Sequence, residues 1–89
     1  MKYVLLYESE DLSKAPLHQE AHSARGREFH ERGHLIAYGP FTNPQDEGAM
    51  AVFTSREAAE EFASADPFVL NGVVRSSWQV REWLEAFLP

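Results

Sequence analysis

The sequence predicts an α+β fold in which four strands and two helices follow one another in the order β-α-β-β-α-β. Four short runs of aliphatic and aromatic residues are typical of strands. Two longer runs have capping residues and helical spacing, and the connections between all six are short. The chain has 89 residues, the size of one domain, so we expect a single domain over residues 1–89.

The first half of the chain begins with a strand and continues with a long helix. The run 3–7, Tyr-Val-Leu-Leu-Tyr, is rich in residues that strands favour. We expect a helix from about Pro16 to Arg32, because proline suits the first helical turn. Ser13 is a candidate cap, and Gly33 suits the left-handed position that follows a helix.

Two strands come next, over residues 34–38 and 49–53. We expect Gly39 and Pro40 to end the first of them, and residues 43–48 to form a loop. Because the connection is short, the two strands should pair antiparallel.

The second helix is expected after Thr54, which forms a capping-box pattern with Glu57. It carries alanines and a phenylalanine at helical spacing, and it should end at Asp66, because the residue before a proline is pushed out of the helical region. Asn-Gly at 71–72 marks a turn, and the last strand is expected over residues 73–83.

Two right-handed β-α-β crossovers joined by a hairpin make a ferredoxin-like sandwich, with both helices on one face of an antiparallel sheet. The first three strands are nevertheless apolar on both sides. In the second strand, for example, Leu35 and Ala37 alternate with Ile36 and Tyr38. A sheet covered on one face only should alternate apolar with polar residues.

The other face of the sheet therefore needs a cover, since soluble monomers avoid large exposed apolar patches. We expect the sheet of a second subunit to supply it, which makes the protein a homodimer. The alternative is that the C-terminal tail, with Trp83, Phe87 and Leu88, folds back over this face.

Composition excludes several classes of partner. Eight basic and fourteen acidic residues give a net charge of −6, which argues against a nucleic-acid partner. No apolar run approaches the roughly 18 residues of a membrane span, and the N-terminal stretch does not resemble a signal peptide. The absence of cysteine fits a reducing compartment, so we expect a cytoplasmic protein without nucleic-acid or membrane partners.

The four histidines invite a metal interpretation. His18 and His22 are four residues apart, as are His30 and His34, and this spacing can place two imidazoles on one helical face. The zinc motif H-E-x-x-H requires a glutamate where this chain has Gln19, and no third ligand is evident. We therefore expect neither a metal nor another cofactor.

The first helix places its histidines at the boundary of its expected buried face. At about 100° per residue, one stripe of this helix combines histidine, arginine and phenylalanine side chains, and an apolar stripe lies beside it. The mixed stripe holds His18, His22, Arg25 and Phe29, and the apolar stripe holds Leu17, Ala21 and Ala24.

Asp66 and His22 are the candidates for chemistry. Asp66 ends the second helix, which should pack beside the first, so its carboxylate and the His22 ring could meet at one end of the helical layer. A carboxylate bonded to an imidazole fixes its tautomer and raises its basicity, as general acid–base catalysis requires. The simpler interpretation is that Asp66 caps the turn that begins at Pro67.

Three landmarks resemble the YCII-related (YciI-like) family. They are residues 22–35, which read His-Ser-Ala-Arg-Gly-Arg-Glu-Phe-His-Glu-Arg-Gly-His-Leu; the Gly-Pro at 39–40; and Ala-Asp-Pro-Phe-Val at 65–69 followed by Gly72. The resemblance covers nearly the whole chain and implies one YCII-like domain over 1–89 that forms a dimeric α/β barrel.

The resemblance also implies an active site in which His22 and Asp66 act as an acid–base pair. His18, one turn earlier, is an alternative imidazole. The first helix departs from the family's pattern, because it is unusually polar and has Gly26 in its middle.

These observations together predict a lyase, isomerase or hydrolase that acts on a small organic molecule, with His22 transferring a proton and Asp66 orienting its ring. The residues expected around the substrate are Tyr7, Tyr38, Gly39, Pro40 and Phe68. One alternative is a non-catalytic ligand-binding or regulatory dimer that uses the same cleft. Another is a purely structural dimer.

Overall fold

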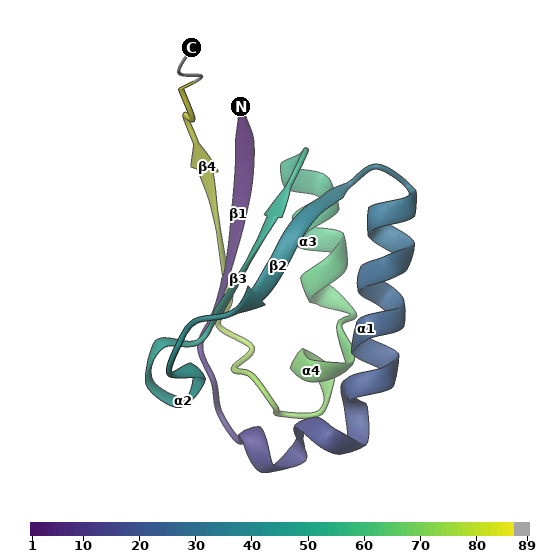
Figure 1. Cartoon of the computed structure of the whole chain (residues 1–89), viewed down its shortest axis with the longest axis vertical. Coiled ribbons are helices and arrows are strands. Elements are labelled where there is room, and N and C mark those ends of the chain that lie inside the picture. Colours follow the sequence, from purple (N-terminus) through teal and green to yellow (C-terminus); the bar gives the residue numbers. More distant parts are fainter. Residues whose placement is uncertain (87–89) are drawn as a thin grey trace.

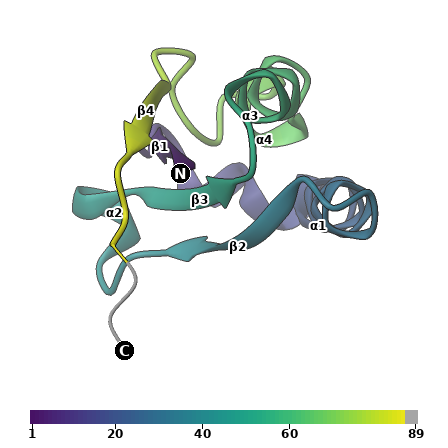
Figure 2. The ribbon, with the colours of Figure 1, turned by 90° about the horizontal axis from the view of Figure 1, so that it is seen from above.

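The computed structural model describes residues 1–86 and contains a four-stranded antiparallel sheet with its main helices on one face (Figures 1 and 2). The strands are β1 (Lys2–Tyr7), β2 (Leu35–Pro40), β3 (Ala49–Phe53) and β4 (Gln79–Trp83). The helices are α1 (Ala15–Glu31), α2 (Pro44–Glu47), α3 (Arg56–Ser64) and α4 (Pro67–Leu70), with a 3₁₀ turn, η1, at Leu12–Lys14.

The strand order β2-β3-β1-β4 is that of a ferredoxin-like fold, as the sequence predicted. β1 pairs antiparallel with both β3 and β4, and β2 pairs antiparallel with β3. Each β-α-β crossover therefore skips one strand, and the two crossovers interleave. The C-terminal end of β1 at Tyr7 comes to lie beneath the helices.

The core lies between the sheet and the helices. Phe29 of α1, Phe53 of β3 and Phe62 of α3 are fully buried, and their rings meet edge-on or tilted at centroid separations of 5.2–6.5 Å. Aromatic pairs in this geometry add to the free energy that area burial supplies. The remaining buried hydrophobic residues include Leu5, Leu35, Ala58, Ala59, Ala63, Val73 and Val74.

β2 is longer and more irregular than expected. It continues through Gly39 and Pro40, because β2 is an edge strand and a proline there removes no interior hydrogen bond. A bulge between Leu35 and Ala37 shifts the register, so that Leu35 and Tyr38 both pair with residues on the helix-facing side of β3. The simple alternation expected for this strand was wrong.

Two further predictions were wrong, one for residues 43–48 and one for the start of the last strand. Residues 43–48 include a short helix, α2, rather than only a loop. β4 begins at Gln79 instead of residue 73, because the amide groups of Val73 and Val74 donate to the carbonyl of Phe68 and not to a neighbouring strand.

The helix caps differ by one or two residues from those expected. Ser13 caps no helix: its N–H and hydroxyl donate to the Asp11 carboxylate at the start of η1. α3 is capped by Ser55, whose hydroxyl accepts from the Ala58 N–H. Thr54 instead faces the start of β2, because its hydroxyl donates to the carbonyls of Gly33 and His34 and its N–H donates to the His34 carbonyl.

α1 buries a different face from the apolar stripe. Leu17 is 84% exposed, and Ala21 and Ala24 are exposed as well. The buried residues of this helix are His22, Gly26 and Phe29. The buried face therefore includes the mixed stripe, and His22 lies inside it.

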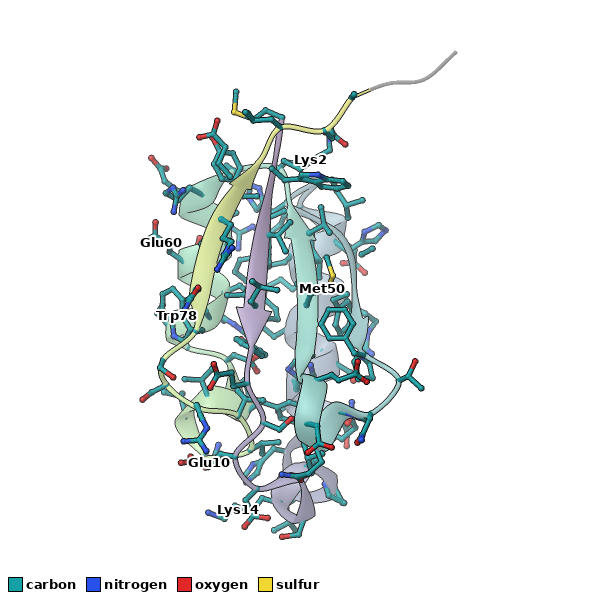
Figure 3. All side chains as sticks on the ribbon, turned by 90° about the vertical axis from the view of Figure 1, so that its left-hand side faces the viewer. Lys2, Glu10, Lys14, Met50, Glu60 and Trp78 are labelled. Carbon is teal, nitrogen blue, oxygen red and sulfur yellow. The ribbon has the colours of Figure 1, made fainter. Side chains whose placement is uncertain are left out.

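The face of the sheet opposite the helices is apolar over β1 and β3, as expected, whereas β4 adds Gln79 and Arg81 beside Leu6 and Val4. It carries Val4 and Leu6 from β1 and Met50 and Val52 from β3, all only partly buried. Figure 3 views this face of the sheet and labels Met50. In the described part of the tail, Glu85 lies 2.8 Å from the Lys2 ammonium group. Phe87 and Leu88, which the alternative cover requires, lie outside the described residues.

Within residues 1–86, no helix has the length and apolar character needed to cross a membrane.

Gly48, which ends α2, provides a test of how closely the backbone at this point packs against the end of β1. Its backbone has φ +74° and ψ −145°, and a Cβ there would overlap the Tyr7 carbonyl. We expect Gly48→Ala to lower the free energy of unfolding by about 3 kcal/mol or more, because it adds a backbone clash to an unfavourable φ. The measurement is urea unfolding followed by circular dichroism.

Gly33→Ala is the matched control. Gly33 has a similar φ of +79°, but nothing lies within 4 Å of a Cβ at this position. We expect a loss of about 1 kcal/mol from the backbone conformation alone. Equal losses for the two variants would contradict the proposed overlap with Tyr7.

Candidate active site

Asp66 lies between α3 and α4, where it caps α4. Its backbone is extended, and its Oδ1 accepts a hydrogen bond of 3.0 Å from the Phe68 N–H. The proline that follows suits the first helical turn, so the sequence Asp-Pro-Phe determines this cap locally. The simpler interpretation of Asp66 thus describes one of its contacts.

The Asp66 side chain is completely buried and meets two further donors. The Tyr7 hydroxyl donates to Oδ2 over 2.6 Å, and His22 Nδ1 lies 2.8 Å from Oδ1. Burial of a carboxylate is costly unless hydrogen bonds replace its water, and here β1, α1 and α4 each supply one donor. The structure therefore brings together His22 and Asp66, the two residues that the sequence paired.

These contacts determine which nitrogen of His22 is free. A carboxylate can only accept hydrogen bonds, so Nδ1 carries the proton that Asp66 binds. Nε2 is then left with its lone pair in the neutral ring. The His22–Asp66 pair can thus accept a proton at Nε2 and stabilise the imidazolium that results.

Aromatic rings fix the orientation of the His22 side chain. It stacks on Phe68 with a centroid distance of 3.9 Å and an interplanar angle of 4°. Tyr38 meets it edge-on at 5.8 Å. Gly26, one turn after His22, makes room for Tyr38, because a Cβ there would lie 3.0 Å from the Tyr38 hydroxyl. The glycine that weakens α1 therefore helps to build the site.

A cavity of about 320 Å³ lies beside the His22 ring. It falls at the small end of the range for small-molecule sites. The five residues expected around a substrate, Tyr7, Tyr38, Gly39, Pro40 and Phe68, all line it together with His22. Asp66 lies behind His22 and does not belong to the lining.

Tyr7 has a contact that the sequence did not indicate. It was expected only to wall the pocket, but its hydroxyl donates to Asp66. Burial and the nearby Asp66 charge raise the pKa of Tyr7 far above its ordinary value of 10.0, so the phenol stays protonated and remains a donor. A signal was present, since a tyrosine on the buried face of a strand normally finds a partner for its hydroxyl.

Arg25 is a second residue whose contacts were missed. Its guanidinium donates to the carbonyls of Glu61 and Phe62 near the end of α3, over 2.8 and 3.2 Å. It also lies over the rings of Phe29 and Phe62. Arg25 thus binds α3 to the turn of α1 that follows His22.

The other histidines lie apart from this pair. His30 Nδ1 is 2.8 Å from the Leu35 carbonyl, and His34 packs beside Phe29. His18 does not line the cavity. Across residues 1–86, no cluster of three or more histidine or carboxylate side chains is arranged to bind a metal.

Removing the Tyr7 hydroxyl tests the buried network. Tyr7→Phe leaves Asp66 Oδ2 without its donor, and we expect the free energy of unfolding at pH 7 to fall by about 2 kcal/mol. Above pH 10 the unfolded chain can ionise this phenol while the folded chain cannot, so the native protein loses stability as pH rises. In urea titrations at pH values above 10, Tyr7→Phe should lose less stability with rising pH than the wild type does.

Tyr3→Phe is the control for this experiment. Tyr3 lies on the same strand, and its hydroxyl contacts the Met1 sulfur at an exposed position. We expect a change within about 0.5 kcal/mol. If the two variants respond alike to pH, the Tyr7–Asp66 bond does not have the assigned effect.

Comparison with known proteins agrees with this architecture. The model of the YCII-related domain matches residues 1–84. The proteins called YciI in Escherichia coli O6:H1 and in Shigella flexneri are each 35% identical over 85 residues, covering 82% of this chain and 87% of theirs.

Two solved structures share the fold. The 5-chloro-2-hydroxyhydroquinone dehydrochlorinase from Burkholderia phenoliruptrix AC1100, in complex with 2,5-dihydroxybenzoquinone, aligns with a TM-score of 0.61 and 17% identity over 97% of this chain and 96% of its own. An antibiotic biosynthesis monooxygenase aligns with a TM-score of 0.53 and 15% identity over the whole of both chains. On the evidence of the domain match and the two YciI relatives, the chain belongs to the YCII-related family.

Proposed function

We propose that the protein is an enzyme that uses His22 as a general acid–base on a small organic substrate. The observation that carries the proposal is the buried Asp66 carboxylate, which accepts from His22, Tyr7 and the Phe68 amide. This arrangement leaves the other imidazole nitrogen for a molecule in the adjoining cavity. A buried ionisable pair beside a cavity is a common sign of a functional site.

In this mechanism, Nε2 of His22 removes a proton from an acidic C–H or O–H group of the bound molecule. The positive charge that forms on the ring is stabilised by Asp66, 2.8 Å from Nδ1. The imidazolium then returns the proton. Delivery to another carbon completes an isomerisation, and delivery to a leaving group completes an elimination. If the first proton comes from water, the oxygen of that water bonds to the substrate, the bond to the leaving group breaks, and the leaving group takes the proton back from His22, which completes a hydrolysis.

Relatives in fold support a small-molecule reaction. One structural neighbour is a dehydrochlorinase crystallised with a quinone, and another is a monooxygenase. Both names describe enzymes, so this fold is compatible with a catalytic site for a small molecule. We base the residue roles on the geometry of this chain alone.

The proposal predicts a large effect of His22→Ala on turnover. Substrates can be sought by incubating the protein with a metabolite extract and following products by mass spectrometry. On a substrate found in this way, loss of the imidazole should lower kcat/KM by about 10²–10⁴-fold, the usual contribution of positioned acid–base catalysis.

His18→Ala is the matched control, since it removes an imidazole from the preceding turn of α1. It should leave the rate unchanged. Equal turnover by the wild type and His22→Ala would refute the role of His22. Saturable binding with no turnover by the wild type would favour the non-catalytic alternative.

We also propose that the enzyme is a homodimer in which the outer faces of two sheets meet. Four partly buried apolar side chains, Val4, Leu6, Met50 and Val52, form the centre of this face. Trp83 on the adjoining β4 is 49% exposed. A second copy presents the same apolar surface, so contact between the two faces would remove the apolar side chains of both subunits from water.

Val52→Lys should convert the protein to monomers in sedimentation velocity, because it places a charge at the centre of the proposed interface. Leu17→Lys makes a similar change on α1, where the leucine is 84% exposed, and should leave the sedimentation coefficient unaltered. A wild-type protein that sediments as a monomer at all concentrations would contradict the dimer.

A further inference from the structure

The walls of the cavity beside His22 are neutral. Among the described residues that line it, none is lysine, arginine, aspartate or glutamate. The sheet contributes aliphatic side chains such as Leu5 and Ala51, and the segment after α4 contributes Val73 and Val74. An anion that entered would lose its hydration and find no lysine or arginine in exchange.

Two neighbouring features reinforce this selectivity. The Asp66 carboxylate lies directly behind His22, so the field at that end of the cavity disfavours negative charge. The amino end of α1 also borders the cavity, but its first residues offer few amide donors. The Ala15 N–H already donates to the Leu12 carbonyl, and Pro16 has none.

The polar groups available to a ligand lie on α1 and β2. Besides His22, they come from Gln19, one turn earlier on α1, whose Nε2 already donates to the Ser23 hydroxyl over 3.0 Å, and from Tyr38, whose hydroxyl lies near Gly26. The Ser9 hydroxyl is engaged because it donates to the Pro44 carbonyl over 2.6 Å. A ligand with one polar group and an apolar body therefore matches the lining.

Size and ring geometry restrict the ligand further. A cavity of about 150 Å³ holds a benzene molecule, so about 320 Å³ accommodates one or two rings with a small substituent. Phe68 covers one face of the His22 ring at 3.9 Å. A polar group should therefore approach Nε2 in the plane of the imidazole.

We propose that the cavity takes an uncharged compound of one or two rings, which presents an acidic hydroxyl group, or a C–H group beside a carbonyl, to Nε2 of His22. The cavity discriminates against carboxylates, sulfates and phosphates of the same size. This inference rests on the proposed function in taking the cavity to be the substrate site.

Two probes of nearly equal shape test the discrimination. 4-Hydroxybenzamide is neutral at pH 7, whereas 4-hydroxybenzoate carries a full negative charge. By isothermal titration calorimetry, the amide should bind tenfold or more tightly than the carboxylate, on the order expected when a charge is left unpaired in an apolar site. Equal or tighter binding of the carboxylate, or no binding of either probe at millimolar concentration, would overturn the proposal.

Ala15→Lys provides a second arm by adding a cation at the rim. Ala15 lines the cavity, so this variant should gain affinity for 4-hydroxybenzoate, at least to parity with the amide. Ala21→Lys adds the same charge at an exposed position on the same helix and should retain the wild-type preference. Equal effects of the two lysines would show that net charge, and not the cavity wall, determines selectivity.

The two proposals fail in different ways. Tight binding of the neutral probe, 4-hydroxybenzamide, with no turnover of any neutral compound supports the assigned ligand class and counts against catalysis. His22-dependent turnover of an anionic substrate supports catalysis and overturns the assigned ligand class.

Discussion

The burial of one carboxylate determines how the parts of this small fold come together at the site. Asp66 is fully removed from water, and leaving such a group without donors costs several kcal/mol. Its three donors lie 59, 44 and 2 residues away along the chain: the Tyr7 hydroxyl, His22 Nδ1 and the Phe68 amide. The hydrogen bonds from these three donors therefore fix the position of the end of β1 and the rotation of α1 relative to α4. The pose of His22 and the protonated state of Tyr7 both follow from them.

Most of the architecture could be predicted because it depends on local patterns. Apolar runs located the strands, and Gly33 and Pro67 marked where the helices stop or restart. The two main errors have different causes. The bulge at the start of β2 is set by its pairing with β3, a partner that lies outside the local sequence. The late start of β4 reflects a local turn, in which the amides of Val73 and Val74 bond to Phe68 a few residues earlier, although the apolar pattern there is typical of a strand.

The site was predictable to a similar degree. A helix-ending Asp-Pro and a histidine on the neighbouring helix, together with the family resemblance, were enough to pair Asp66 with His22. The face of α1 was misjudged because hydrophobicity favoured Leu17, whereas the core admits His22 through its bond to Asp66 and Gly26 through its contact with Tyr38. The contact of Tyr7 with Asp66 spans 59 residues, so the sequence could indicate that a buried tyrosine needs a partner but not that the partner is Asp66.

Asp66 holds His22 with its proton on Nδ1 and leaves Nε2 as the acceptor. Nitrogen-15 NMR of the imidazole rings in the free protein tests this most directly, with His18 as a reference in the same spectrum. We expect the neutral His22 ring to show a protonated, pyrrole-type Nδ1 and an unprotonated, pyridine-type Nε2. A His22 proton found on Nε2, or shared by rapid exchange between the two nitrogens, would contradict the account.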